Sequence, residues 1–396
     1  MKIVINAASA KIGGAVSYLR NLLQHLPPPE SGYRFFVFLT ADTAKLSADV
    51  RGNIKICALP SKDASGWRRL WWEQVTLRRF LRRENIDALF STANFAVFHC
   101  PVRQILLVRN ALYFSKMYRQ MFLGKHGLRH RLAFALRRWM ILQSVRSADV
   151  LMTPTQAMLD DLRQFVEVGP QKALVNPYGV VPVNSSLLGD QKVIPESPPA
   201  AQRVVRLIYV SLYSEHKNLS TLLRAMPLLN SNRPGKFLLT TTVDPAWDGA
   251  AWTVTYKEDM ALARQSDVAP WVEFLGPLSR QRALELYPAA DLFVFPSLCE
   301  SFGFPMVEAM TYGVPIVASD TAANREVCGD AAVYFKPLGA EDLAQQVTSL
   351  VEDGALMGKL AAVGRERAAT LFRWDTHVQR ILECAHLETN PRDDRA

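Results

Sequence analysis

Apolar runs of strand length alternate with segments of helical periodicity along most of the chain. In the first half, strands are expected at 2–7, 33–40, 87–92, 103–108 and 148–155, and helices at 14–26, 66–83 and within 115–147. In the second half, strands are expected at 205–211, 236–242, 271–276, 291–297 and 314–320, and helices at 218–229, 279–290 and 304–313. Two or more further helices close the chain. This alternation predicts an α/β fold with a parallel, doubly wound sheet in each half.

The alternation breaks at residues 181–202, which are rich in proline and serine and have little periodicity. We therefore expect two Rossmann-like domains in tandem, facing each other across a cleft that holds the ligand. The expected organisation is an N-terminal domain at 1–185, a linker at 186–203, a C-terminal domain at 204–370, a terminal helix at 371–387 that returns to the N-terminal domain, and a disordered tail at 388–396.

Composition excludes several classes of protein. With 396 residues, 49% hydrophobic and 21% charged, the chain is neither disordered nor collagen-like. Its five cysteines form no C-x-x-C pair, which argues against a disulfide framework and favours a reducing compartment. The first apolar run is short for a signal peptide, and no run is long enough to span a membrane, so we expect a cytoplasmic protein. His126 and His130 have helical spacing but lack a third ligand candidate, and we expect no metal site.

The net charge of +9 is unevenly distributed, because residues 1–185 carry +15 and the remainder carries −6. This asymmetry predicts an anionic partner for the first domain. Two segments there, 66–83 and 115–146, interleave arginines and lysines with large apolar residues. Such a composition suits interfacial helices on an anionic membrane, although ordinary helices packed on their own sheet would have the same pattern. Nucleic acid is not expected, since no nucleic-acid-binding motif is present. The candidate interfacial residues are Trp67, Leu70, Trp71, Gln74, Leu77 or Leu81, Phe114, Met117, Met121, Phe122, Leu128, Leu132, Phe134 and Trp139.

The segment at 291–320 carries the candidate chemistry. A buried strand ends at Pro296, a loop with Glu300 follows, and Pro305 suits the first turn of the next helix. Glu308 falls one turn into that helix, where its side chain leans back toward the helix N-terminus, so both carboxylates can face one pocket. Backbone amides at the start of the helix would point at an anion or at sugar hydroxyls. These amides belong to Ser301, Phe302, Gly303 and Phe304.

The frame ESFGFPMVEAM, with seven residues between its two glutamates, is similar to the signature of the retaining glycosyltransferases of family 4. These enzymes have the GT-B fold of two Rossmann-like domains around a cleft. The resemblance covers nearly the whole chain. Other matching segments are IGGAVSYLRNLLQHL (12–26), ADVLMTPTQAMLDDL (148–162), NPYGV (176–180), HKNLSTLLRAMPLL (216–229), FLGPLSRQRALELYPAADLFVFPS (274–297) and LFRWDTHVQRIL (371–382).

The resemblance implies a role for each matching position. Glu308 would bind the two ribose hydroxyls of the nucleotide, and Glu300 would contact the donor sugar. Lys217, with His216 beside it, would bind the diphosphate and stabilise the charge that grows on it as the glycosyl bond breaks. Gly13 and Gly14 would let the first-domain backbone approach the donor.

Two positions depart from the family pattern. Leu212 stands where most members carry an arginine that binds the diphosphate. Arg109 and Asn110 stand where members often have a His-Asp pair. Arg109 could contact the donor and replace the missing cation, or it could simply pair with a nearby carboxylate. Asn110 is a further donor-binding candidate.

The implied activity is transfer of a hexosyl group from a nucleotide sugar to a lipid-linked or surface polysaccharide acceptor. The enzyme would retain anomeric configuration, need no metal or cofactor, and lie on the cytoplasmic face of the inner membrane. GDP-mannose is the first donor to consider and UDP-hexoses are the second. The alternatives are a nucleotide-sugar epimerase, a soluble transferase that makes a small glycoside, and a non-catalytic binding protein of the same fold.

Overall fold

The computed structural model describes residues 1–10, 14–44, 51–59, 66–180, 204–232, 235–247, 249 and 253–387. Contacts between residues divide the chain into two compact units. Unit 1 contains residues 1–114, 132–179 and 373–396, and unit 2 contains residues 115–131 and 180–372. The expected linker at 186–203 and tail at 388–396 lie outside the described residues.

Unit 1 is built on a sheet whose strands run in the order β3-β2-β1-β4-β5-β6-β7, with every neighbouring pair parallel. Its interior strands are continuous apolar runs because both faces of the sheet are covered. The edge strands β3 and β7 are partly exposed, lack such a run, and were not expected from the sequence. The strands are β1 (Lys2–Asn6), β2 (Arg34–Thr40), β3 (Ile54–Leu59), β4 (Ala88–Ser91), β5 (Arg103–Leu107), β6 (Val150–Thr153) and β7 (Ala173–Val175).

The helices of unit 1 bury one apolar side against this sheet. The helical stretch at 66–83 has a π-helical turn, Trp72–Leu77, in its middle, and Trp72, Leu77 and Leu81 pack beneath strands β1, β2 and β4. The helices are α1 (Gly14–His25), α2 (Ala41–Ala44), α3 (Gly66–Trp71), α4 (Arg78–Arg83), α6 (Leu128–Ser147), α7 (Gln156–Arg163) and α15 (Trp374–His386).

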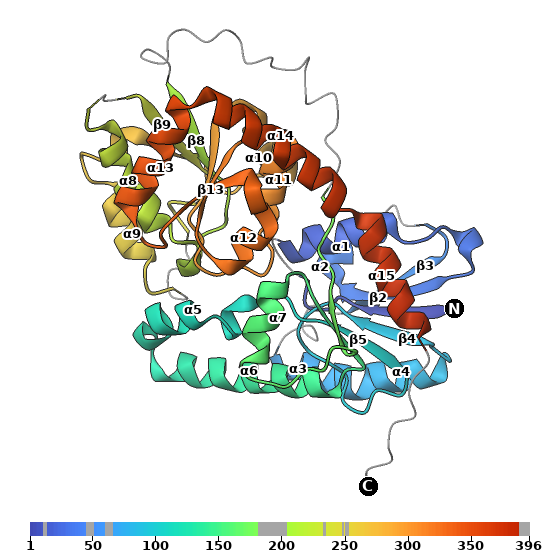
Figure 1. The fold of residues 1–396 in the computed structure, drawn as a ribbon. Coiled ribbons are helices and arrows are strands. Elements are labelled where there is room, and N and C mark those ends of the chain that lie inside the picture. The colour runs from blue at the N-terminus through green and yellow to red at the C-terminus, as the bar shows by residue number, and fades with distance from the viewer. Residues whose placement is uncertain are drawn as a thin grey trace. The chain divides into compact units, whose positions relative to one another are not determined.

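The C-terminal helix α15 is held in unit 1 by a buried aromatic cluster (Figure 1). His377 lies 2.9 Å from the hydroxyl of Tyr18 and 2.9 Å from the carbonyl oxygen of Pro177. The rings of Tyr178 and Trp374 stack nearly parallel in the same cluster. Burial lowers the pKa of His377 to about 3, so its ring is neutral at physiological pH.

Unit 2 repeats the same topology with the strand order β10-β9-β8-β11-β12-β13, again all parallel. The two sheets confirm the predicted pair of doubly wound α/β units. The sequence interpretation missed the short strand β13 and the helix α9. The strands are β8 (Val205–Tyr209), β9 (Phe237–Thr241), β10 (Val272–Phe274), β11 (Leu292–Phe295), β12 (Ile316–Ser319) and β13 (Ala332–Phe335).

Helices cover both faces of the unit 2 sheet. Helices α8, α9 and α13 pack around the main apolar core on one face, while α10, α11 and α12 lie on the other (Figure 1). Helix α14 packs against α11. The helices are α8 (Leu219–Asn230), α9 (Tyr256–Ala263), α10 (Arg280–Ala289), α11 (Phe304–Tyr312), α12 (Ala322–Cys328), α13 (Ala340–Glu352) and α14 (Gly354–Leu371).

Residues 115–131, which the sequence interpretation assigned to the N-terminal domain, pack with unit 2. This segment contains helix α5 (Lys116–Met121) and the start of α6. The hydroxyl of Tyr118 donates to Glu215 Oε1 at 2.7 Å, and Nε2 of His126 lies 2.8 Å from the same oxygen. The other oxygen of Glu215 accepts the backbone N–H of Val254 at 3.1 Å. A polar network, rather than apolar periodicity alone, therefore sets the place of this segment.

Candidate functional site

The strand order of unit 2 marks where a ligand would bind. Strands β8 and β11 are neighbours, and the chain winds away from this pair in opposite directions along the sheet. In doubly wound sheets, ligands bind outside the carboxyl ends of the strands at such a switch point. Lys217 ends the 3₁₀ turn that follows β8, and Glu300 lies in the loop that follows β11.

At this point the structure brings Lys217 and Glu300 into contact. The ammonium group of Lys217 donates to Glu300 Oε1, and the same oxygen accepts the Ser297 hydroxyl at 2.7 Å. The ammonium also lies 5.5 Å from the centre of the Phe295 ring. Only 18% of the lysine side chain and 10% of the glutamate side chain are exposed. The pair is therefore largely desolvated.

The two loops that carry this pair are tied together by hydrogen bonds to backbone carbonyl oxygens. The carbonyl oxygen of His216 accepts the N–H of Leu298 at 2.8 Å, and the side-chain amide of Asn218 donates to the carbonyl oxygen of Pro296 at 3.0 Å. The His216 ring lies 2.7 Å from the Ser214 hydroxyl. Burial, and then the charge of Lys217, hold the pKa of His216 well below its usual range. His216 is thus a neutral residue whose backbone fixes the lysine turn.

Helix α11 begins directly after the Glu300 loop. Gly303 precedes it with φ 78°, a left-handed conformation that favours glycine, and the helix starts without a side-chain cap. A Cβ at position 303 would approach the Cε of Met306 to 2.5 Å. Phe302 is buried against Phe304 and Phe372, while Ser301 is partly exposed. The positive end of the α11 dipole therefore lies beside the loop that carries Glu300.

Glu308 lies in α11 with both carboxylate oxygens already bonded within unit 2. Oε1 accepts from the guanidinium of Arg280 at 3.0 Å, and Oε2 accepts the Tyr287 hydroxyl at 2.9 Å. Glu308 is only 8% exposed. Burial raises the pKa of its carboxyl, and Arg280 followed by Tyr287 lower it in part.

The site residues predicted in the first half lie in unit 1. Gly13 is outside the described residues, and Gly14 is the exposed first residue of α1. Tyr18 also lies in α1, and the Arg109 guanidinium lies 5.6 Å from the centre of its ring. In the part of the chain that the structure describes, no carboxylate pairs with Arg109. The side chain of Asn110 accepts the N–H of Leu112 at 3.2 Å and so caps a 3₁₀ turn.

In each unit, sequence reasoning missed residues that contact the predicted ones. Asn94, with φ 60°, accepts the backbone N–H of Arg109 at 2.8 Å and so fixes the end of β5. Ser297 was readable in principle, because it follows a buried strand directly. Arg280 and Tyr287 gave no such signal, since an arginine and a tyrosine on an amphipathic helix are common. Leu212, the departure from the family pattern, is 55% exposed.

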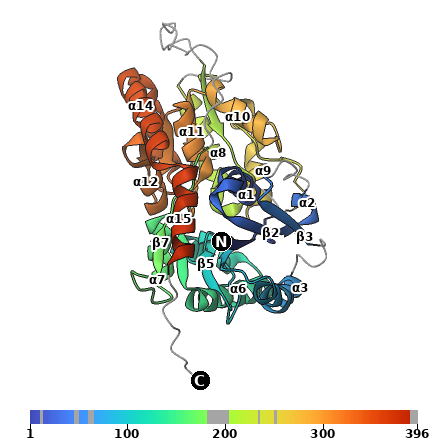
Figure 2. The same cartoon turned by 90° about the vertical axis from the view of Figure 1, so that its right-hand side faces the viewer.

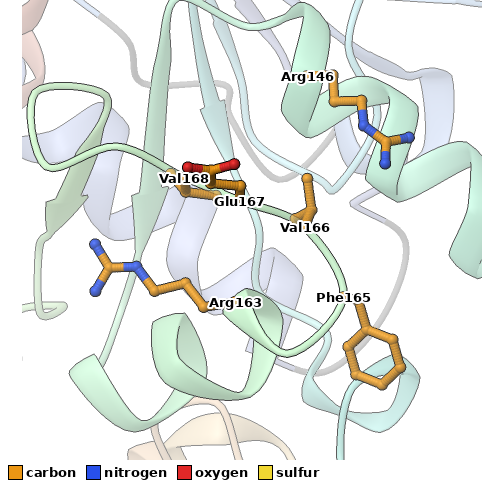
Figure 3. A pocket seen from close by; sticks show the side chains of 6 residues that line it. All are labelled: Arg146, Arg163, Phe165, Val166, Glu167 and Val168. Carbon is orange, nitrogen blue, oxygen red and sulfur yellow. The ribbon is translucent and has the colours of Figure 1, made fainter.

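Neither a metal cluster nor a hollow on unit 1 marks this site in the described ranges. Within the described ranges, no three His, Cys, Asp or Glu side chains come close enough together to hold a metal ion. A hollow of about 490 Å³ on unit 1 is lined by Arg146, Arg163, Phe165, Val166, Glu167 and Val168 (Figure 3). None of the predicted site residues lines it.

The two basic segments, 66–83 and 115–146, divide into buried and exposed positions. Leu77, Leu81, Phe114, Phe122 and Phe134 are buried, which corrects the expectation that they are interfacial. By contrast, α6 exposes an apolar stripe at residues 128, 132, 136 and 139, and α3 exposes two tryptophans. Figures 1 and 2 both draw α3 and α6 on the same side of the unit 1 sheet. Among the described helices, none has the length and apolarity to cross a bilayer. The exposed residues are Trp67 (71%), Trp71 (62%), Leu128 (67%), Leu132 (61%), Leu136 (45%) and Trp139 (57%).

Both halves of the chain match families of glycosyltransferases. Residues 12–182 match the family described as Glycosyltransferase Family 4, and residues 190–367 match Glycosyl transferases group 1. The O-antigen chain mannosyltransferase B of Escherichia coli is 27% identical over 215 residues, covering 52% of this chain and 54% of that protein. A glycogen synthase of Mycobacterium tuberculosis is 27% identical over 262 residues, covering 64% of this chain and 58% of that protein. The matches thus span little more than half the length of these curated relatives.

Solved structures resemble nearly the whole chain. A sucrose-phosphate synthase from Thermosynechococcus elongatus has a TM-score of 0.71 at 17% identity, covering 97% of this chain and 98% of that one. WaaG, a glycosyltransferase involved in lipopolysaccharide biosynthesis, has a TM-score of 0.69 at 16% identity, covering 98% of this chain and 100% of that one. Anabaena Alr3699/HepE in complex with UDP-glucose has a TM-score of 0.69 at 19% identity, covering 97% of this chain and 98% of that one. The chain therefore belongs to the glycosyltransferases of group 1 and family 4, and its two Rossmann-like units are those of the GT-B fold.

Proposed function

We propose that this glycosyltransferase moves a hexosyl group, with retention of configuration, from a nucleotide sugar to a lipid-linked or surface polysaccharide acceptor. The observation that carries the proposal is the largely desolvated pair of Lys217 and Glu300 at the switch point of unit 2, with the N-terminus of α11 beside it. A cation and a helix N-terminus suit a diphosphate, and a carboxylate suits the hydroxyls of a sugar.

Each residue has a defined part in the proposed reaction. The bond between the anomeric carbon and the diphosphate oxygen breaks, and the acceptor oxygen bonds to that carbon on the same face. The acceptor proton passes to the leaving phosphate oxygen. Lys217 and the positive end of α11 stabilise the negative charge that grows on the diphosphate. Glu300 holds donor-sugar hydroxyls and favours positive charge near the anomeric carbon, while Glu308 accepts the ribose hydroxyls.

The remaining predicted donor contacts come from unit 1. In the proposal, the glycine loop that ends at Gly14 lets the backbone approach the donor, and Arg109 supplies the cation that Leu212 does not. Asn110 is a further donor contact in the proposal, and its side chain also caps a turn. The reaction as proposed uses these cations and the helix dipole, and needs no metal ion or further cofactor.

GDP-mannose is the first donor to test, because one relative is named an O-antigen chain mannosyltransferase. UDP-hexoses are second, because a solved neighbour was determined with UDP-glucose. Thermal unfolding measured against a panel of nucleotide sugars tests both. A donor at 100 times its dissociation constant adds roughly 2.7 kcal/mol to the free energy of unfolding. Stabilisation by no nucleotide sugar at saturating concentration would contradict the assignment and favour a non-catalytic protein of this fold.

We also propose that unit 1 docks on the cytoplasmic face of an anionic membrane through α3 and α6. The exposed apolar stripe on α6 is flanked by the exposed arginines Arg129, Arg131 and Arg137, and α4 adds Arg79, Arg82 and Arg83. Apolar residues that enter the headgroup region, with basic residues around them, are what an interfacial helix needs. Each Lys or Arg near such a surface contributes about 1 kcal/mol, which salt screens.

Sedimentation with vesicles tests this docking. Wild-type protein should bind vesicles that contain phosphatidylserine at low salt, and bind less as salt rises. Replacing Leu132 and Leu136 by serine should abolish most of the binding, while serine at the equally exposed Leu371 of unit 2 serves as the matched control. Equal binding by the two variants would contradict the α6 surface. Failure of the wild type to bind would instead favour an anionic soluble acceptor.

A further inference from the structure

The carboxylate of Glu308 is held from two sides by residues that the family resemblance does not assign. Arg280 is the first residue of α10 and bonds Oε1 at 3.0 Å, while Tyr287, two turns later in the same helix, bonds Oε2 at 2.9 Å. Tyr287 is fully buried, and Arg280 keeps 27% of its side chain exposed. With a donor on each oxygen, the carboxylate cannot rotate without breaking one of these bonds.

The hydrogen-bonding capacity of Glu308 limits what else it can accept. An ionised carboxylate has about four lone-pair sites on its two oxygens. Arg280 and Tyr287 use one site on each oxygen, which leaves one on each. Two hydroxyls on neighbouring carbons, such as those of a ribose, can take up these remaining sites together. The internal bonds thus leave a carboxylate with the right capacity and a fixed orientation.

The charge state of Glu308 depends on the same two neighbours. Burial raises the pKa of its carboxyl, and the nearby guanidinium and phenol lower it. The groups that face it from α10 are Arg280 and Tyr287, and Tyr312 follows on its own helix, stacked on Tyr287 at 5.6 Å. Arg365 of α14 lies at the other end of α11, beside Gly313. Arg280 is therefore the cation next to this carboxylate.

We propose that Arg280 and Tyr287 are positioning residues for nucleotide binding: they fix the orientation of the Glu308 carboxylate so that it accepts the two ribose hydroxyls. This inference rests on the proposed function, because it takes Glu308 as the ribose-binding residue. The simpler reading is that the three residues only fasten α10 to α11. That reading predicts a loss of stability on mutation without any change in how the protein recognises a ribose.

The test compares affinities for UDP, GDP and their 2′-deoxy forms by calorimetry across pH, using variants whose folding is checked by circular dichroism. The ratio of affinities for a nucleotide and its 2′-deoxy form reports hydroxyl recognition by itself. Tyr287→Phe should lower affinity for the ribonucleotide on the order of 10-fold, since a hydrogen bond to a charged group is lost. Tyr287→Phe should lower the affinity for the 2′-deoxy nucleotide by a smaller factor. The ratio of the affinity for the ribonucleotide to that for the deoxy form should therefore decrease.

Arg280 is tested through the pH profile. Nucleotide affinity should fall as pH falls through the pKa of Glu308, because the protonated carboxyl accepts hydroxyls poorly. Arg280→Gln removes the neighbouring cation, so the midpoint of this fall should move to higher pH, and Arg280→Lys should restore part of the shift. Arg282→Gln is the matched control, because Arg282 lies on the same helix but pairs with Glu285 at the surface.

The outcomes separate this inference from the proposed function. If Glu308→Gln keeps wild-type nucleotide affinity, the ribose assignment of the proposed function fails, and this inference fails with it. If Glu308→Gln loses affinity but Arg280→Gln and Tyr287→Phe keep the wild-type midpoint and ribose-to-deoxyribose ratio, only this inference is overturned.

Discussion

Replacing Lys217 by alanine should affect stability and catalysis through different interactions, and a second mutation can separate them. In the structure, Lys217 forms an ion pair with Glu300. Lys217→Ala removes this partner from a carboxylate that has 10% of its side chain exposed, and among the described residues the Ser297 hydroxyl still donates to it. During catalysis the same ammonium would face the diphosphate. Removing the charge of Glu300 should restore the stability that Lys217→Ala loses. It should not restore the turnover, because the diphosphate still lacks its cation.

The magnitude follows from the burial of the pair. Two unit charges 4 Å apart attract by about 4 kcal/mol at an effective dielectric of about 20. Because 18% of the lysine side chain still meets solvent, we expect a smaller coupling energy, about 1–3 kcal/mol. Lys217→Ala should therefore lower the free energy of unfolding by about that amount. The double variant with Glu300→Gln should be close to Glu300→Gln alone.

Two assays on these variants, which form a double-mutant cycle, separate the effect on stability from the effect on catalysis. Urea unfolding of the wild type, both single variants and the double variant gives the coupling energy. Turnover with a confirmed donor and acceptor should fall on the order of 10²-fold in Lys217→Ala and should not recover in the double variant. Arg282→Ala, which breaks an exposed pair, should change stability by less than about 1 kcal/mol. Additive stability effects, or turnover within threefold of wild type in Lys217→Ala, would refute the reasoning.

Three further results are expected. Gly303→Ala should lower stability by at least about 1–2 kcal/mol, because of φ 78° and the contact with Met306; a chemical melt like that of the wild type would contradict the strained start of α11. Glu308→Ala should weaken GDP or UDP binding by about 1.5–3 kcal/mol in calorimetry, and unchanged affinity would remove Glu308 from the site. Burial raises the pKa of the Asp259 carboxyl from 3.8 to about 6. Between these two pH values the folded protein holds a proton that the unfolded chain has lost. The free energy of unfolding therefore falls as pH rises from about 4 to 7. Asp259→Asn should remove about 3 kcal/mol of this dependence, as measured by urea unfolding at each pH, and parallel curves for the two proteins would count against it.

Much of the fold was readable in the sequence, because interior strands of a parallel sheet are buried on both faces and therefore form continuous apolar runs. This holds for β1, β5, β8 and β11, which were all placed within a few residues. The edge strands β3 and β7 were missed because one side of each meets solvent, which breaks the run. The helix at 66–83 was predicted, but its π-helical turn was not, since no pattern of side chains in the sequence marks one.

The sequence also singled out Lys217, Glu300 and Glu308 as candidate site residues, through the resemblance of the segments around them to the family's motifs. Only the tertiary structure decided how these residues are partnered. Contacts between positions such as Arg280 and Glu308 join different helices, and local periodicity carries no information about them. The same is true of residues 115–131, whose place in unit 2 depends on a buried glutamate about a hundred residues away in the sequence. Burial patterns are local properties of a chain and can be read from it, whereas hydrogen-bond partners across the fold depend on how its elements pack.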